Sequence, residues 1–144
     1  MPHIQIDYSA SLADAVAQGR LVDRVHQAAI DSGIFPVWGI RTFARAVDDC
    51  RVGNGQAGNG FVNLSVRIAP GRSLALRQRI GQLLFGAVLD AMGPLFDKHR
   101  LGCQLEVTEF DAALSVYQNN LASTGSPDEP VLCRTTAGTQ EPPP

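Results

Sequence analysis

The chain has 144 residues, of which 44% are apolar and 18% charged, and its formal net charge at pH 7 is -2. This length and composition are typical of one globular domain with a hydrophobic core. The small negative charge and the dispersed basic residues argue against nucleic acid and the membrane surface as partners, and no apolar segment approaches the roughly 20 residues needed to cross a bilayer. Because the N-terminus also lacks a secretion signal, we expect a cytoplasmic protein.

Cysteine and histidine patterns indicate neither a disulfide framework nor a metal centre. The cysteines, Cys50, Cys103 and Cys133, are odd in number, far apart and without a C-x-x-C pair. The three histidines are equally scattered and show no metal-ligand spacing. We therefore expect no metal and no cofactor. Any bound anion would be held by a few well-placed residues, which favours a small-molecule ligand.

The first part of the chain predicts a strand, a helix and a second strand. Residues 3–8 alternate apolar and polar side chains, as a half-buried strand does. A helical pattern then runs to about Ser32, and Gly33 followed by Pro36 prevents its continuation. The second strand is expected over 38–48, where one face carries Arg41, Phe43, Arg45 and Val47.

The next part repeats this order after a glycine-rich connection at residues 53–60. That connection lacks the Lys-Ser/Thr of a phosphate-binding loop and precedes a strand rather than a helix, so a turn is the better interpretation. A strand is expected over 61–69. A helix from residue 74, with Ser73 as its N-cap, should kink or end at Gly93-Pro94. A last strand is expected over 103–110.

The order of elements predicts an α/β (α+β) fold built from two βαβ units. These pseudo-repeats, about 1–52 and 60–121, would form a four-stranded sheet with two helices on one face, within a domain of residues 1–121. Residues 122–144 are rich in proline and small polar residues and are expected to be a tail. The helix-free face would then need a cover, which self-association would provide.

Four short motifs stand out along the expected domain. They are Met1-Pro2-His3, Gly33-Ile34-Phe35-Pro36 with Gly39-Ile40-Arg41, Gly71-Arg72-Ser73-Leu74, and Gln118-Asn119-Asn120. In this order, they resemble the 5-carboxymethyl-2-hydroxymuconate isomerase family of the tautomerase superfamily. The resemblance implies a tautomerase-like fold, a homotrimer, an N-terminal proline that acts as a base, and a role in bacterial breakdown of homoprotocatechuate.

Pro2 has chemistry that suits such a base. A small second residue normally allows removal of the initiator methionine, which would leave Pro2 with a free secondary amine. An α-amino group has a pKa near 8, and burial beside cations lowers that pKa. A base poised near neutral pH is what proton abstraction from carbon requires.

Two arginines are the expected partners of Pro2. Arg72 precedes a predicted helix N-terminus, where backbone N–H groups favour an anion, and its guanidinium can hold a carboxylate through two bonds. Arg41 lies on the polar face of its strand. The resemblance implies that Arg41 and Arg72 bind substrate carboxylates and stabilise a dienolate. Phe43 and Arg45 share the face of Arg41 and complete the expected substrate-binding set, Arg45 as a third cation for a tricarboxylate.

The leading hypothesis is therefore a cofactor-independent isomerase that shifts a proton and a double bond in an unsaturated keto or enol polycarboxylic acid. A second hypothesis is a tautomerase acting on a smaller acid, such as a phenylpyruvate or an oxalocrotonate-like diacid. A third is a non-catalytic trimeric binding protein that retains Met1. In that case Pro2 would be an amide and would have no basic nitrogen.

Overall fold

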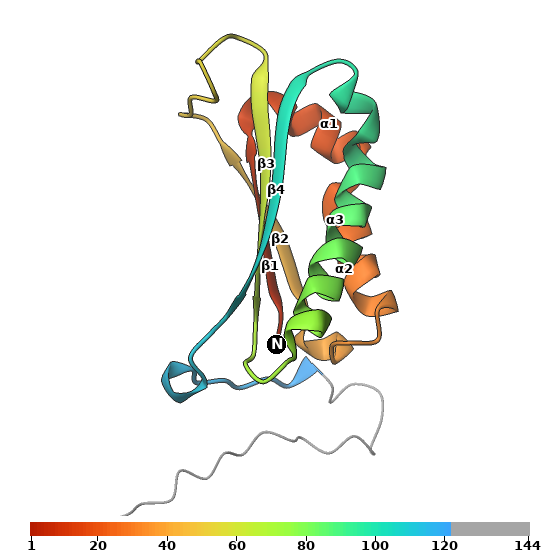
Figure 1. Ribbon diagram of the computed structural model, residues 1–144, viewed down its shortest axis with the longest axis vertical. Helices are drawn as coiled ribbons and strands as arrows, with labels where there is room; N and C mark the ends of the chain where they lie inside the picture. The colour runs from red at the N-terminus through yellow and green to blue at the C-terminus, as the bar shows by residue number, and fades with distance from the viewer. Residues whose placement is uncertain (122–144) are drawn as a thin grey trace, which may run out of the picture.

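In the computed structural model, which describes residues 1–121, helices cover one face of a four-stranded sheet and leave the other face bare (Figure 1). The strands are β1 (His3–Ser9), β2 (Arg41–Val47), β3 (Asn59–Ile68) and β4 (Arg100–Glu109). The helices are α1 (Ala13–Gln18), α2 (Leu21–Asp31) and α3 (Leu74–Phe96), with short 3-10 turns η1 (Ala10–Leu12), η2 (Val37–Gly39) and η3 (Ala112–Leu114). The expected tail, 122–144, lies outside the described residues.

The sheet has the strand order β2-β1-β3-β4. β1 pairs with β2 and β3 pairs with β4 in parallel, while the central pair, β1 with β3, is antiparallel. Each parallel pair with its helical connection is a βαβ unit, so the predicted fold class is confirmed. β4 begins at Arg100, three residues earlier than predicted, because residues 100–102 pair with 59–61 of β3.

The prediction of a single helix before Ser32 is wrong. The segment forms two helices, α1 and α2, with a break between them at Gly19 and Arg20. A Cβ atom on Gly19 would lie only 2.5 Å from the carbonyl oxygen of Ala91 in α3, so only glycine fits there. Arg20 follows with a left-handed φ of 49°. The chain turns at this point because it passes directly against α3.

α3 does not end at Gly93-Pro94 but runs to Phe96. Pro94 has no N–H, so it cannot donate to the carbonyl of Asp90 one turn earlier. Nη1 of Arg24 in α2 approaches that carbonyl oxygen at 3.4 Å. Part of the hydrogen bonding lost at Pro94 is thus recovered from the neighbouring helix.

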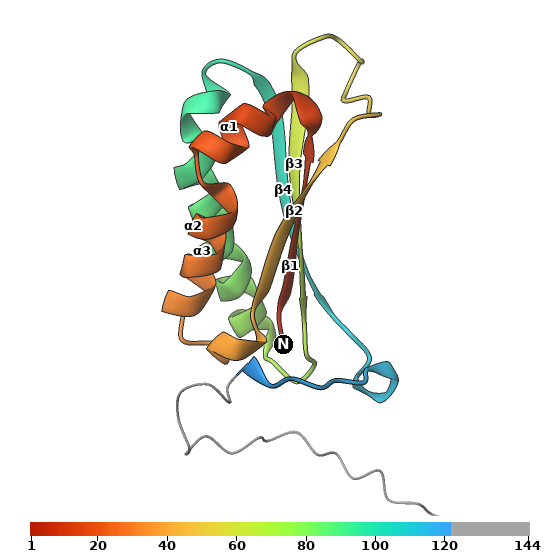
Figure 2. The ribbon, with the colours of Figure 1, turned by 180° about the vertical axis from the view of Figure 1, so that it is seen from behind.

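The sheet and the helices form two layers in the views from both sides (Figures 1 and 2), and the hydrophobic core lies between them. Alternate residues of β1 and β3 point into it, and they meet the apolar sides of α2 and α3. The largest fully buried side chains are Ile4, Ile6, Leu21, Leu64, Ile68, Ile80, Leu84 and Met92. The other residues of each strand lie on the helix-free face, which is largely polar.

Candidate active site

The N-terminus lies at one end of the sheet, where Pro2 leads into the central strand β1. Pro2 is buried, and its carbonyl oxygen accepts a hydrogen bond of 3.1 Å from the backbone N–H of Arg41. Arg41 is the first residue of β2 and pairs in register with His3. The parallel pairing of β1 with β2 therefore places a guanidinium group beside the start of the chain.

Met1 lies on this site. Its sulfur accepts a contact of 3.2 Å from Nη1 of Arg41. Its Cγ atom would be 3.3 Å from a Cβ on Gly39, so the absence of a side chain at Gly39 makes room for the methionine. While Met1 is attached, the nitrogen of Pro2 is an amide and cannot act as a base.

Arg41 is half-buried and its guanidinium has only weak partners. Besides Met1, it approaches Nε2 of His3 at 3.4 Å and lies 5.7 Å from the ring centroid of Tyr117. Within residues 1–121, no carboxylate forms an ion pair with Arg41. An anion that enters beside Pro2 would meet a partly desolvated cation, where electrostatic attraction is stronger than in bulk water.

Arg72 lies in the loop between β3 and α3. Gly71, whose φ is 99°, makes the turn, and Nη1 of Arg72 donates to the carbonyl of Ala69 at 3.0 Å. The guanidinium lies 5.3 Å from the ring centroid of the buried Phe35. Ser73 accepts a bond from the N–H of Leu76, which confirms it as the N-cap of α3. The Gly33–Pro36 and Gly71–Leu74 motifs thus meet in space.

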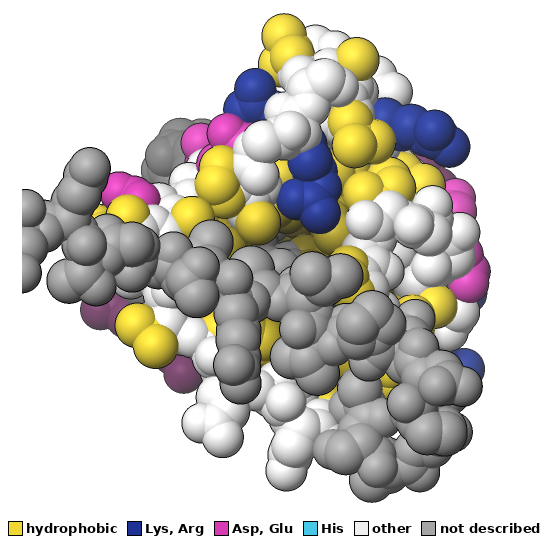
Figure 3. Space-filling view, turned by 90° about the horizontal axis from the view of Figure 1, so that it is seen from below, with side chains coloured by type: hydrophobic (Ala, Val, Ile, Leu, Met, Phe, Trp, Pro, Cys, Tyr) yellow, Lys and Arg dark blue, Asp and Glu magenta, His cyan; other side chains and the backbone are white. Residues whose placement is uncertain are grey.

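The last motif reaches the same end of the molecule. After β4 the chain crosses beneath the sheet, past the N-terminus (Figures 1 and 2). Nδ2 of Asn119 donates to the carbonyl of Trp38, just before Arg41, at 3.0 Å. Its Oδ1 accepts from the N–H of Leu121. The view of this end shows basic side-chain atoms recessed between hydrophobic ones (Figure 3).

Arg45 lies farther along the same strand and already has a partner. Its Nε donates to Oδ1 of Asp7 at 2.8 Å, and its Nη2 donates to Oδ2 at 3.3 Å. The hydrogen bond from Arg45, with a smaller contribution from Gln5, holds the pKa of Asp7 below its usual value. Four residues of strand, ~13 Å, separate Arg45 from Arg41. Phe43 lies between them and is 42% exposed.

His3 and Arg67 also belong to this end of the sheet, although the sequence pattern did not single out Arg67. His3 pairs in register with Arg67 of β3 as well as with Arg41 of β2. Burial, followed by the positive charges of Arg41, Arg67 and the N-terminus, lowers the pKa of His3. Arg67 could not be identified from the sequence because its place beside His3 depends on the strand order, which a single sequence does not reveal.

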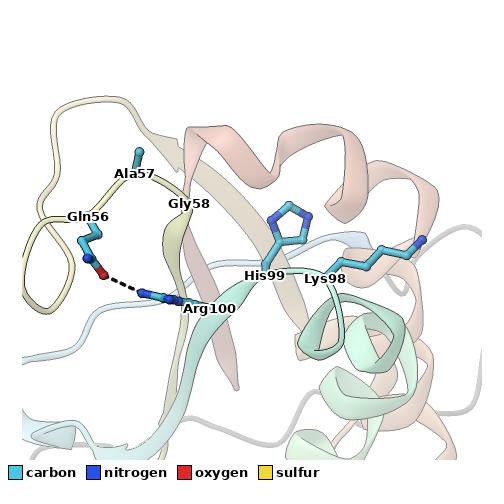
Figure 4. A pocket seen from close by; sticks show the side chains of 6 residues that line it. All are labelled: Gln56, Ala57, Gly58, Lys98, His99 and Arg100. Atoms are coloured by element: carbon cyan, nitrogen blue, oxygen red, sulfur yellow. Dashed lines mark hydrogen bonds between the residues drawn. The ribbon is translucent and has the colours of Figure 1, made fainter.

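A hollow with a volume of about 450 Å³ lies at the opposite end of the sheet (Figure 4). Its lining residues are Gln56, Ala57, Gly58, Lys98, His99 and Arg100. Arg100 donates to Gln56, while Lys98 and His99 point away from Arg100 (Figure 4). Because these side chains do not converge on a common point, the end that contains Pro2 is the better candidate site.

Two further features of residues 1–121 bear on function. No group of three or more histidine, cysteine, aspartate or glutamate side chains in this part of the chain is arranged to hold a metal ion. Among its helices, none is both long and apolar enough to span a membrane.

Comparison with known proteins gives consistent matches over the described domain. A family model for 5-carboxymethyl-2-hydroxymuconate isomerase matches residues 2–124. The 5-carboxymethyl-2-hydroxymuconate Delta-isomerase of Escherichia coli is 30% identical over 121 residues, which cover 84% of this chain and 96% of that protein.

Solved structures agree with these matches. The crystal structure of a 5-carboxymethyl-2-hydroxymuconate isomerase from Deinococcus radiodurans R1 has a TM-score of 0.79 at 26% identity, with 85% of this chain and 92% of that chain covered. A fused 4-OT protein described as an asymmetric trimer has a TM-score of 0.59 at 12% identity, covering 86% of this chain and 99% of that chain, and shares the fold.

Proposed function

Since the chain belongs to the 5-carboxymethyl-2-hydroxymuconate isomerase family, within the tautomerase superfamily, we propose that it shifts a proton and a double bond in an unsaturated keto or enol polycarboxylic acid, with Pro2 as the base. The observation that carries this proposal is the position of Arg41. It lies beside the buried Pro2, half-buried, and forms no ion pair with a carboxylate of residues 1–121.

The proposed reaction begins once Met1 has been removed. The Pro2 nitrogen is then a secondary amine, and its burial beside Arg41 favours the neutral form that accepts a proton. It takes the hydroxyl proton of an enol substrate, or a proton from the carbon next to the carbonyl group of a keto substrate, and either step leaves a dienolate. Arg41 stabilises the negative charge that develops on oxygen. The same proton returns at another carbon, so the reaction needs no cofactor or co-reactant.

The remaining predicted site residues would bind the carboxylates and the carbon chain of the substrate. Arg72, held by the Ala69 carbonyl and the Phe35 ring, would donate hydrogen bonds from its other N–H groups to a substrate carboxylate. Phe43 supplies an apolar contact surface beside Arg41. By analogy with the E. coli relative, the first candidate substrate is 5-carboxymethyl-2-hydroxymuconate, an acid of homoprotocatechuate breakdown.

A second candidate is a keto–enol diacid resembling an oxalocrotonate. The specific observation in its favour is the ion pair between Arg45 and Asp7. Arg45 would have to leave that carboxylate to bind a third substrate carboxylate. A diacid does not need Arg45 and leaves the pair intact. A panel of keto acids followed by ultraviolet absorbance separates the two candidates.

We propose that the working enzyme is a cytoplasmic homotrimer. The helix-free face carries Phe43 and Phe61 among polar side chains, and several large apolar side chains beyond β4 are exposed, with Leu114 and Val116 at 83% and 101%. A threefold arrangement would bury these surfaces in one assembly. The trimeric description of the fused 4-OT protein of the same fold supports this arrangement.

The test of the proposed base is to compare two preparations of one chain, one with Met1 removed and one with Met1 retained, as verified by intact mass. The processed protein should isomerise 5-carboxymethyl-2-hydroxymuconate, and the unprocessed protein should not. In processed protein, Pro2→Ala should lower kcat strongly because a primary amine differs in basicity and geometry. Equal activity with Met1 in place would eliminate Pro2 as the base.

A further inference from the structure

Three residues form a row across the helix-free face of the sheet, next to Pro2. Arg41 of β2 and Arg67 of β3 are the register partners of His3, which lies between them in β1. Neighbouring strands are ~4.8 Å apart, so the Cα atoms of the two arginines are about 10 Å apart. Side chains at paired positions leave the sheet on the same face, so both guanidinium groups lie on one side.

Arg67 resembles Arg41 in how it is held. Its guanidinium lies 5.6 Å from the ring centroid of Phe110, as that of Arg41 lies 5.7 Å from Tyr117. Both rings come from the segment that follows β4, and the N–H of Phe110 donates to the carbonyl of Ile68, next to Arg67. A ring face orients a guanidinium without neutralising its charge.

The positive charge of Arg67 is also not compensated by a carboxylate within the part of the chain that the structure describes. It is exposed and forms no ion pair there. On the same sheet face, Asp7 is already bound to Arg45, and Glu106 pairs in register with Ser65, one step farther from Pro2. The end of the face nearest Pro2 is therefore positively charged.

His3 fits between the two arginines because it is neutral. A guanidinium only donates, so the contact of 3.4 Å between Nη1 of Arg41 and Nε2 of His3 requires Nε2 to accept and Nδ1 to carry the proton. The charges of Arg41 and Arg67 oppose protonation of the ring. The row thus presents two cations and a neutral hydrogen-bonding group, not three cations.

We propose that Arg67 is a further carboxylate-binding residue, acting across His3 from Arg41, and that this row selects substrates with a carboxylate at each end of a short chain. The inference rests on the proposed function for the place of Pro2 in the site. Arg67 would act in addition to Arg72, and it differs from Arg72 in lying within β3, on the helix-free face. Two guanidinium groups balance the two charges of a dicarboxylate, whereas a monocarboxylate leaves Arg67 without a partner.

The experiment compares two unreactive acids with the same six-carbon trans,trans-diene chain: trans,trans-muconate, which has two carboxylates, and sorbate, which has one. Titration calorimetry on the processed full-length protein should show that muconate binds at least tenfold more tightly than sorbate. Arg67→Gln should abolish most of that preference by weakening muconate binding while leaving sorbate binding within about twofold. Arg79→Gln, at an exposed position of α3 in the helix layer, is the matched control and should preserve the preference.

A preference for muconate that is equal in wild type and Arg67→Gln overturns the inference, as does a wild type that does not prefer muconate. If Arg67→Gln fails to fold, Arg67→Lys replaces it. Lysine keeps the charge but loses the paired donors, so the preference should fall partway, and an unchanged preference again overturns the inference. Turnover of 5-carboxymethyl-2-hydroxymuconate tests the proposed function separately: binding with the expected preference but no turnover contradicts only the isomerase reaction.

Discussion

The guanidinium of Arg72 lies 5.3 Å from the ring centroid of Phe35, although the two residues belong to motifs almost forty positions apart. The contact with Phe35 and the bond to Ala69 fix Arg72 at the loop before α3, and the bond uses only one of its N–H groups. A flexible surface arginine would lose more conformational entropy on binding.

Replacement of Arg72 should therefore weaken substrate binding. Arg72→Ala removes a charge-assisted hydrogen bond worth about 1.5–3 kcal/mol, so KM for a dicarboxylate should rise tenfold or more. Arg72→Lys keeps the charge but not the stack or the paired donors, and should give an intermediate KM. An unchanged KM in Arg72→Ala would assign Arg72 a purely structural role.

Arg41 should act mainly on the chemical step. Its guanidinium lies beside Pro2 and is proposed to stabilise the dienolate, an interaction that strengthens in the transition state. Loss of one such donor costs about 100-fold or more in kcat, so Arg41→Gln should lower kcat by that order in processed protein. Steady-state kinetics of the variant and the wild type measures this decrease in kcat. A variant that changes only KM would show that Arg41 binds the substrate without aiding the reaction.

His3 should make folding stability depend on pH. Its pKa in the folded protein is lowered from 6.5, first by burial and then by Arg41 and Arg67, so the unfolded chain takes up the proton at a higher pH. Stability is then greatest above about 6.5 and falls as the pH decreases through this region. Urea unfolding between pH 7.5 and 5 should show the decrease in wild type and a smaller one in His3→Asn. His99→Asn, at the other end of the sheet, is the control.

Asp7 should respond to loss of its arginine. The hydrogen bond from Arg45 holds the pKa of Asp7 below its usual value, so its contribution to stability is present above that usual value and is lost as the pH falls. In Arg45→Gln the pKa of Asp7 should rise toward the ordinary range, as NMR titration of the carboxyl carbon would show. If the pKa does not move, the ion pair does not form in solution.

The assembly is open to a direct measurement. Sedimentation equilibrium at low micromolar concentration should give the mass of a trimer. Dilution that dissociates it should lower activity in parallel, because the site at Pro2 lies at the end of the sheet that the neighbouring copies would enclose. A stable monomer with full activity would contradict the proposed trimer and any site shared between subunits.

Most of the fold was predictable because strands and helices leave periodic patterns. Alternation along 61–69 identified β3, and Ser73 identified the start of α3. The break at Gly19 was not predictable, since its cause is the carbonyl of Ala91, more than seventy residues away. Likewise, residues 100–102 have no strand pattern of their own and become part of β4 by pairing with β3.

The candidate site could be proposed from the sequence where chemistry marks a single residue, and not where it depends on neighbours. Pro2, Arg41 and Arg72 stood in recognisable motifs. Arg67 looked like one more polar residue of an alternating strand, and only the pairing of β1 with both β2 and β3 places it across His3 from Arg41. The bond from Arg45 to Asp7 similarly joins residues 38 positions apart.

The position of Met1, with its sulfur on Arg41 and its side chain over Gly39, has a practical consequence for anyone who purifies the protein. An affinity tag fused ahead of Pro2 would leave the same kind of peptide bond and bulk in that place. With Pro2 as the proposed base, such a preparation is expected to fold normally and still fail every isomerase assay. Screens of candidate acids should therefore use protein tagged at the other end, with the first residue verified before any substrate is rejected.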